Sequence, residues 1–213
     1  TVSGDLPSRH YALRNRVNTS NGSTIYPSEQ IYFYNNIISD HTGTMGSELG
    51  SAGGQNQFSD SPIAYVHDFE IGRNLFWNGG NVIPVTSFAS ALDFNKDTIA
   101  LVGDPQLRTP INIQLPRWNG TTFADGSTTI AQVFTNLVQL YAIPDTASLA
   151  NASADPDHIS PVDIMGKTRS IISPEIGAYE FAEPTPTPSP TTAATTAPSA
   201  TPIASTPTPT PSR

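Results

Sequence analysis

A short internal repeat constrains the fold of this chain more than any other feature of its sequence. Three pentapeptides with an apolar first and last residue around a polar centre begin at residues 13, 33 and 71, so they lie 20 and 38 residues apart. The first interval is typical of one coil of a solenoid, and the second of a coil that carries an insertion. Stacked coils would place Leu13, Phe33 and Ile71 in one apolar ladder and Val17, Ile37 and Leu75 in another. The repeat therefore predicts parallel stacked strands, and it leaves open a β-sandwich with antiparallel strands.

The C-terminal end of the chain has a composition that cannot build a core. Residues 183–213 are almost wholly Pro, Thr, Ser and Ala, with Ile203 as the large apolar side chain. Such a segment buries too little apolar surface to offset the entropy of ordering it. We expect a folded domain over residues 1–182 and, over 183–213, a disordered, extended spacer. It would serve as a stalk that holds the domain off a cell surface or as a linker between domains.

The rest of the chain is typical of β-structure with one exception. Runs such as residues 30–34 and 64–66 are short, rich in aromatic and β-branched residues, and bounded by Gly, Asn, Ser and Asp. The exception is a set of apolar residues at helical spacing: Ile130, Val133, Phe134, Leu137, Val138 and Tyr141. With Ser127 or Thr128 as N-cap and Pro144 beyond the end, this spacing favours a short amphipathic helix over a long buried strand.

Composition excludes several classes of function. Charged residues make up 13% of the 213 residues, and the net charge is −8 with a pI of about 4.7. Nucleic-acid binding draws on clustered Lys and Arg, whereas the ten basic residues here are scattered. The absence of cysteine excludes disulfides and thiolate metal sites. No apolar run of about 18 residues is present, so we expect no membrane insertion within this sequence.

The last third of the domain carries the most specific motif. Asp163-Ile-Met-Gly166-Lys-Thr-Arg169 is followed by Glu175-Ile-Gly-Ala-Tyr-Glu-Phe181, directly before the Pro/Thr-rich segment. This ending resembles that of right-handed parallel β-helix (pectate-lyase-like) repeat proteins with a choice-of-anchor C-terminal module, in which Asp is usual at the position of Glu175. Three further segments, residues 34–38, 73–77 and 103–107, are similar to coil sequences of that family and occur in the same order.

The resemblance implies an all-β fold, a right-handed parallel β-helix whose C-terminal coils and cap occupy residues 1–182. It also implies an extracellular or cell-surface location, in a bacterium. The chain would then be the end of a longer protein, with further coils preceding Thr1. The residues we assign to a structural cap are Asp163, Gly166, Arg169, Ile176, Gly177, Tyr179 and Glu180.

The chemistry of the motif supports such a cap. The two glycines permit tight turns, and Asp163 and Arg169 have the charges for a hydrogen-bonded ion pair. The apolar Ile176, Tyr179 and Phe181 would cover an open hydrophobic end. We therefore assign these residues no catalytic role.

Signals for a catalytic or metal site are sparse. His and Asp are neighbours at residues 40–41, 67–68 and 157–158, but adjacent side chains point apart on a strand. Asp155, Asp157 and Asp163 leave calcium as a weak possibility, and we expect no other cofactor. Trp118, in a loop, and Trp77 are the candidates for stacking on sugar rings.

These features favour an extracellular, surface-anchored scaffold or adhesin-like protein that contacts a polysaccharide or cell-surface glycan. No catalytic residue is assigned in this segment. The alternative is the terminal part of a polysaccharide lyase or glycoside hydrolase whose groove lies in upstream coils. The identity of the glycan does not follow from the sequence.

Overall fold

The computed structural model describes residues 1–4, 6, 10–14, 28–47, 57–60, 66–85, 93–107, 116–141, 144–145 and 147–181. The chain separates into two units, Thr1–Phe181 and Ala182–Arg213. The second unit contains the Pro/Thr-rich segment and lies outside the described residues, so its role as a spacer stays a prediction.

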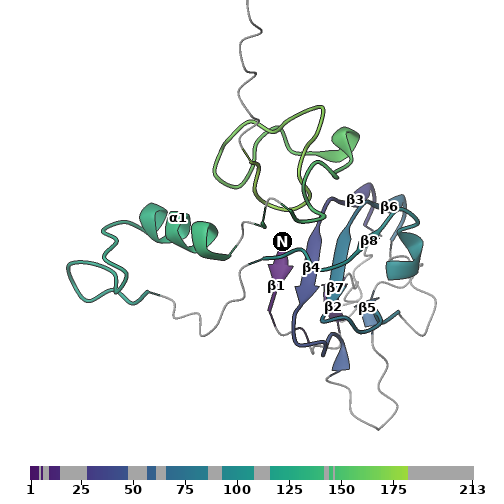
Figure 1. Cartoon of the computed structure of the whole chain (residues 1–213), viewed down its shortest axis with the longest axis horizontal. Helices are drawn as coiled ribbons and strands as arrows, with labels where there is room; N and C mark the ends of the chain where they lie inside the picture. The colour runs from purple at the N-terminus through teal and green to yellow at the C-terminus, as the bar shows by residue number, and fades with distance from the viewer. Residues whose placement is uncertain are drawn as a thin grey trace, which may run out of the picture. The chain divides into compact units, whose positions relative to one another are not determined.

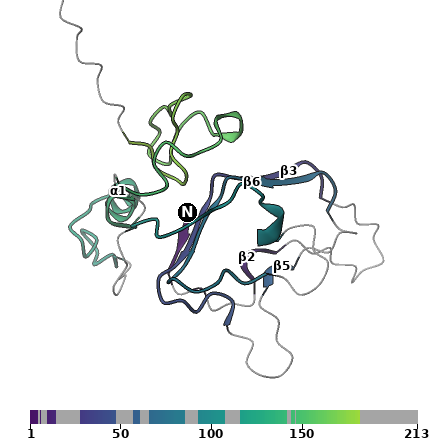
Figure 2. The same cartoon turned by 45° about the vertical axis from the view of Figure 1, so that its right-hand side comes forward.

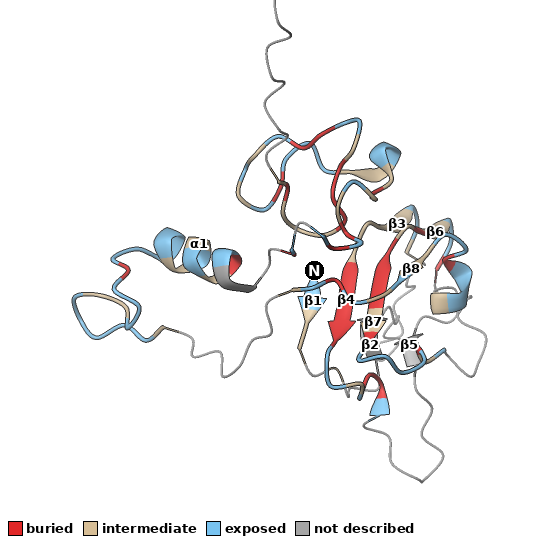
Figure 3. Cartoon of the chain, viewed as in Figure 1, coloured by how far each residue is buried: buried red, intermediate tan, exposed pale blue. Residues whose placement is uncertain are grey.

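A four-stranded parallel sheet forms the centre of the first unit (Figure 1). Its order is β1 (Val2–Ser3), β4 (Ile37–Asp40), β7 (Leu75–Asn78) and β8 (Leu101–Val102). In the register of this sheet Ile37 pairs with Leu75, and Leu75 pairs with Leu101. Strand β4 is buried along its whole length, and β7 is buried apart from Trp77 (Figure 3).

Two further sheets have two parallel strands each (Figure 2). One joins β2 (His10–Arg14) to β5 (Gln57–Asp60), and the other joins β3 (Ile31–Tyr34) to β6 (Phe69–Gly72). In the second sheet, side chains alternate between its two faces. Phe33, Phe69 and Ile71 pack against the core, while Tyr32 and Glu70 are exposed.

The central sheet separates two apolar clusters, which explains why both of its faces are buried. Ile38 and Phe76 belong to one cluster, which also contains Met45 and Ile83. Ile37 and Leu75 belong to the other, where the partners come from the C-terminal part of the unit: Ala150, Ala154 and Ile176. The segment 147–181 therefore covers one face of the central sheet.

A ladder of polar side chains holds the turns that lead into β4 and β7. The Asn74 side-chain oxygen accepts hydrogen bonds from the backbone and side-chain amides of Asn36. Its amide group donates to Asp97 Oδ2 over 2.7 Å and to the Phe33 carbonyl over 2.9 Å. Because Asn74 is fully buried, these bonds satisfy polar atoms that water does not reach.

The predicted helix is confirmed as α1 (Ile130–Tyr141). Its N-terminus is capped by Thr129 rather than by Ser127 or Thr128. The Thr129 hydroxyl accepts from the Gln132 amide, and Gln132 Oε1 accepts from the Thr128 and Thr129 amides, a capping box. Two short 3₁₀ helices, η3 (Phe94–Lys96) and η4 (Pro156–His158), complete the described helices. None of these described helices has the length and apolarity needed to cross a membrane.

The predicted fold class, an all-β right-handed parallel β-helix, is wrong. The described residues form small sheets of four and two parallel strands together with a twelve-residue α-helix, a mixed α/β arrangement. Phe33 does pair with Ile71, but Leu13 pairs with Ser59 in a different sheet, so the expected three-residue ladder is not formed. Val17, expected in the second ladder, lies outside the described residues. The pairings between the described strands are parallel, unlike those of the antiparallel sandwich alternative.

Candidate functional site

The C-terminal motif folds into a tight turn held by Asp163. One oxygen of its carboxylate accepts the backbone amides of Met165 and Lys167, both over 2.8 Å. The other oxygen accepts the Glu180 amide over 3.1 Å, so the same side chain ties the turn to the end of the motif. Gly166 has a φ of 79°, a left-handed conformation that side chains disfavour.

Arg169 is the buried cation of the motif. It forms an ion pair with Glu180 over 3.1 Å, where the sequence predicted a pair with Asp163. Its two terminal nitrogens also donate to the carbonyl oxygens of Glu175 and Gly177. The second Glu180 oxygen accepts the Ser170 amide over 2.8 Å. Backbone groups and one carboxylate thus engage both terminal nitrogens of the guanidinium within the fold.

Glu175 is a buried carboxyl group next to this ion pair. Burial, and then the hydrogen bond to Glu180 and the negative charge of Glu180, raise the pKa of Glu175 from 4.5 to about 8. The Arg169 cation is paired with the Glu180 carboxylate, so keeping a proton on Glu175 avoids a second buried negative charge. Within the described residues, Glu175 Oε2 is buried without a hydrogen-bond partner.

Ile176 and Gly177 dock the motif onto the central sheet. Ile176 is fully buried in the cluster that contains Ile37 and Leu75, so it covers a face of the sheet. Gly177 has a φ of 105°, and a Cβ there would come within 2.7 Å of Ile37 Cδ1. A side chain at this position would therefore displace the motif from the sheet. Tyr179 packs edge-to-face on Phe181, with ring centroids 5.6 Å apart.

Two residues with left-handed backbone, in the turns that lead into β4 and β7, contact the segment 147–160. Asn35 and Arg73 both have a φ of 57° and precede the ladder residues Asn36 and Asn74. The Asn35 side chain accepts the Asp155 amide over 2.7 Å and donates to the carbonyls of Asp155 and His158. Arg73 Nε donates to the Ser153 carbonyl over 2.6 Å.

These contacts place His158 over strand β3. Its ring stacks on Tyr34 with centroids 3.8 Å apart and an interplanar angle of 8°, and it is 5.8 Å from the ring of Tyr32. We call Tyr32, Tyr34 and His158 the aromatic cluster. His158 Nδ1, in the last residue of η4, lies 3.1 Å from Oδ2 of the N-cap residue Asp155.

Gly72 and Glu70, on the neighbouring strand, fix the position of Tyr34. A Cβ at Gly72 would come within 2.5 Å of the Tyr34 ring, so the glycine leaves the room that the ring occupies. The Tyr34 hydroxyl donates to Glu70 Oε2 over 3.4 Å. Partial burial, and then the charge and hydrogen bond of Glu70, raise the pKa of Tyr34, so its hydroxyl keeps its proton.

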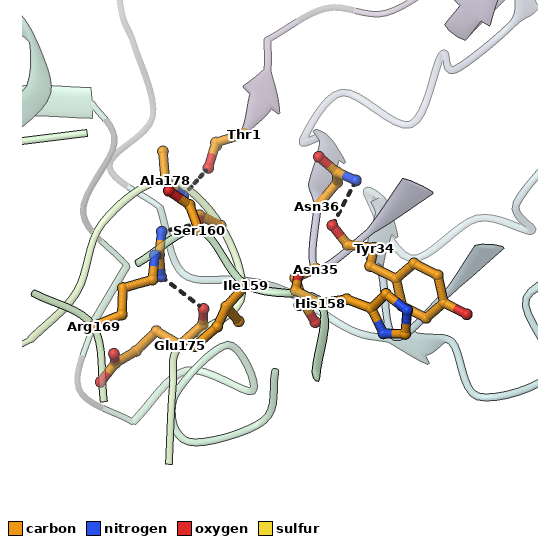
Figure 4. A pocket seen from close by; sticks show the side chains of 11 residues that line it. Thr1, Tyr34, Asn35, Asn36, His158, Ile159, Ser160, Arg169, Glu175 and Ala178 are labelled. Carbon is orange, nitrogen blue, oxygen red and sulfur yellow. Dashed lines mark hydrogen bonds between the residues drawn. The ribbon is translucent and has the colours of Figure 1, made fainter. Parts of the chain in front are cut away.

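A pocket of about 230 Å³ opens between the aromatic cluster and the C-terminal motif (Figure 4). Tyr34, Asn36 and His158 lie on one side of the view, and Arg169 and Glu175 lie on the other. The Glu175 carboxyl points away from His158, so this residue faces the pocket with its backbone. The remaining lining residues are Thr1, Asn35, Ile159, Ser160, Gly177 and Ala178.

The structure brings some of the predicted site residues together and leaves others apart. The seven predicted cap residues share the segment 163–180, and Asp163, Arg169 and Glu180 are linked by hydrogen bonds. Trp118 is 52% exposed and packs against Phe123, away from the pocket lining. Trp77 is half-buried on β7 and does not line the pocket either.

Sequence reasoning missed Tyr34, His158 and Asn35. A signal for His158 was present in the order Asp155-Pro156-Asp157-His158, in which an Asx cap and a proline begin a 3₁₀ turn. The search for neighbouring His and Asp residues paired His158 with Asp157, whereas the turn pairs it with Asp155.

Two of the three carboxylates considered for calcium, those of Asp155 and Asp163, are engaged within the fold. Asp155 accepts the Asp157 amide and contacts His158, and Asp163 holds the turn described above. Among the described residues, no group of three or more His, Asp or Glu side chains is arranged to hold a metal ion.

No protein-family model matches the sequence, and no curated protein shows significant similarity to it. The site geometry therefore carries the functional argument.

Proposed function

We propose that this chain is an extracellular, adhesin-like scaffold that binds polysaccharide through the pocket beside the aromatic cluster. The observation that carries the proposal is the stacked pair of Tyr34 and His158 at the edge of a polar pocket. A sugar ring offers an apolar C–H face to an aromatic ring and hydroxyl groups to polar side chains. The pocket combines both kinds of surface.

The exposure of the cluster supports this proposal. Tyr32 is 56% exposed, and Tyr32 and Tyr34 lie on the same face of β3 because they are two residues apart. Because His158 covers the Tyr34 ring, the aromatic surface offered to a partner is that of the exposed Tyr32 and of the His158 imidazole. The backbone beneath it is fixed by Asn35, so the site is held in shape before a ligand arrives.

The proposed location rests on sequence features. The Pro/Thr-rich segment has the composition of an extended spacer, and the motif before it resembles a module found at the C-terminus of anchored extracellular proteins. A binding unit on a spacer would reach a glycan away from the surface that carries it.

The orientation and hydrogen bonds of the two buried carboxyl groups, Glu175 and Glu180, favour binding over hydrolysis. Glu180 accepts hydrogen bonds from Arg169 and from the backbone amides of Ser170 and Glu175. The Glu175 carboxyl points away from Tyr34 and His158 (Figure 4). Glycoside hydrolysis needs two carboxyl groups that flank the scissile bond. These two are instead directed into the fold.

The test measures binding of the full chain to a panel of plant and bacterial polysaccharides by affinity electrophoresis. Binding by the wild type that falls at least tenfold in His158→Ala, equivalent to about 1.4 kcal/mol, is the expected result. His67→Ala is the matched control, because His67 is an exposed histidine outside the pocket. Binding that both variants retain equally would contradict the proposed site.

A further inference from the structure

The pocket holds several polar groups that the fold itself does not use. Asn36 Oδ1, the Ser160 hydroxyl and His158 Nε2 take part in none of the hydrogen bonds among the described residues. Two of these atoms are potential acceptors, and the hydroxyl both donates and accepts. They suit a ligand rich in hydroxyl groups.

The Arg169 guanidinium and His158 Nδ1, by contrast, already have partners within the fold. Arg169 gives its terminal nitrogens to Glu180 and to two carbonyl oxygens. His158 contacts the Asp155 carboxylate.

Two acidic side chains contact residues that line the pocket. Asp155 lies behind His158, and Glu70 contacts the Tyr34 hydroxyl. The chain as a whole carries a net charge of −8. A carboxylate on a ligand would meet repulsion from these groups and would find no uncommitted guanidinium to pair with.

We propose that this pocket selects neutral sugar units over uronic acids, with the ring face stacked on the aromatic cluster and hydroxyl groups bound by Asn36, Ser160 and His158. This inference rests on the proposed function and gives it a ligand class. It also predicts that binding depends little on salt, because no ion pair forms between ligand and protein.

The test is isothermal titration of the full chain with probes of matched length: cello-, xylo- and manno-oligosaccharides as neutral ligands, and oligogalacturonate as the acidic ligand. We expect at least one neutral probe to bind at least tenfold more tightly than oligogalacturonate. Its affinity should change less than twofold between low and high salt. Asn36→Ala should weaken the neutral probe fivefold or more, whereas Asn119→Ala, in an exposed loop outside the pocket, should not.

The outcomes separate this inference from the function on which it rests. Equal or tighter binding of oligogalacturonate, weakened by His158→Ala, would overturn the selection of neutral sugars and leave the glycan site in place. Failure of every probe, together with failure of the polysaccharide panel, would remove the proposed function itself. Because Asn36 also belongs to the polar ladder, a thermal melt of Asn36→Ala accompanies the titration, and a lost fold would shift the test to Ser160→Ala.

Discussion

Replacing Glu175 by glutamine should stabilise the protein at neutral and alkaline pH. The native state holds a proton on Glu175 up to a pKa of about 8, whereas an unfolded chain releases it near 4.5. Between these values the folded state binds one proton more than the unfolded state, so the free energy of unfolding falls as pH rises. A glutamine has no proton to lose and fills the same space. The variant therefore lacks this loss of stability.

The pKa values set the size of the effect. At about 1.4 kcal/mol for each pKa unit, a shift from 4.5 to about 8 gives an upper bound of about 5 kcal/mol above pH 8 and about 3 kcal/mol at pH 7. The wild type should lose stability steadily from pH 5 to pH 8 and then level off. The titration of Asp40 does not change the stability between pH 5 and pH 8. Burial would raise its pKa, but hydrogen bonds from Thr42 and the Leu6 amide lower it, so its stabilisation is lost only on acidification.

Urea unfolding at a series of pH values, followed by tryptophan fluorescence, measures the effect. The difference between Glu175→Gln and wild type should grow from near zero at pH 4.5 to its full value at pH 8. Glu29→Gln is the control, because Glu29 is an exposed carboxylate far from the ion pair in sequence. Parallel pH profiles for wild type and Glu175→Gln, or a less stable variant at pH 8, would refute the account of this carboxyl pair.

Three further perturbations test other parts of the structure. Ile176→Ala empties a fully buried site on the central sheet and should cost about 2–5 kcal/mol in urea unfolding; a loss below about 1 kcal/mol would mean that the motif does not cover the sheet. Asn74→Ala removes the side-chain amide that donates to the buried Asp97 and accepts from Asn36, and it should cost roughly 2–3 kcal/mol in the same assay. An unchanged midpoint would contradict the polar ladder. Gly72→Ala should push the Tyr34 ring from its place and weaken glycan binding about tenfold by titration, equivalent to about 1.4 kcal/mol, while unaltered affinity would exclude Tyr34 from the site.

Parts of the fold could be predicted from the sequence, and the limits have physical causes. The spacing of 38 residues between Phe33 and Ile71 is their true parallel register, and the helical spacing in 130–141 produces α1. The pentapeptide at Leu13 matches the same pattern, yet its strand pairs with β5. A five-residue segment with an apolar residue at each end can pair in parallel with many strands. The alternation of apolar and polar residues predicts a strand but does not specify which strand lies next to it.

The candidate site was less accessible to sequence reasoning. Asp163, Arg169 and Glu180 were found because they lie in one local motif, although the ion pair joined Arg169 to Glu180. The pocket depends on contacts between Asn35 and the turn of Asp155 and His158, which are 120 and 123 residues away in the chain. No periodicity links those segments. Their contact depends on the left-handed turn at Asn35, where φ is 57°.

The most direct test of the glycan site is an NMR titration of the full chain that follows its histidine and tryptophan side chains. The four histidines and two tryptophans give few enough signals to assign by single substitutions. On addition of a bound oligosaccharide, the imidazole protons of His158 should shift progressively to saturation, while the indole signals of Trp118 and Trp77 stay in place. Saturable binding that moves the Trp118 signal and leaves His158 unchanged would contradict the account and move the site to the loop of Trp118.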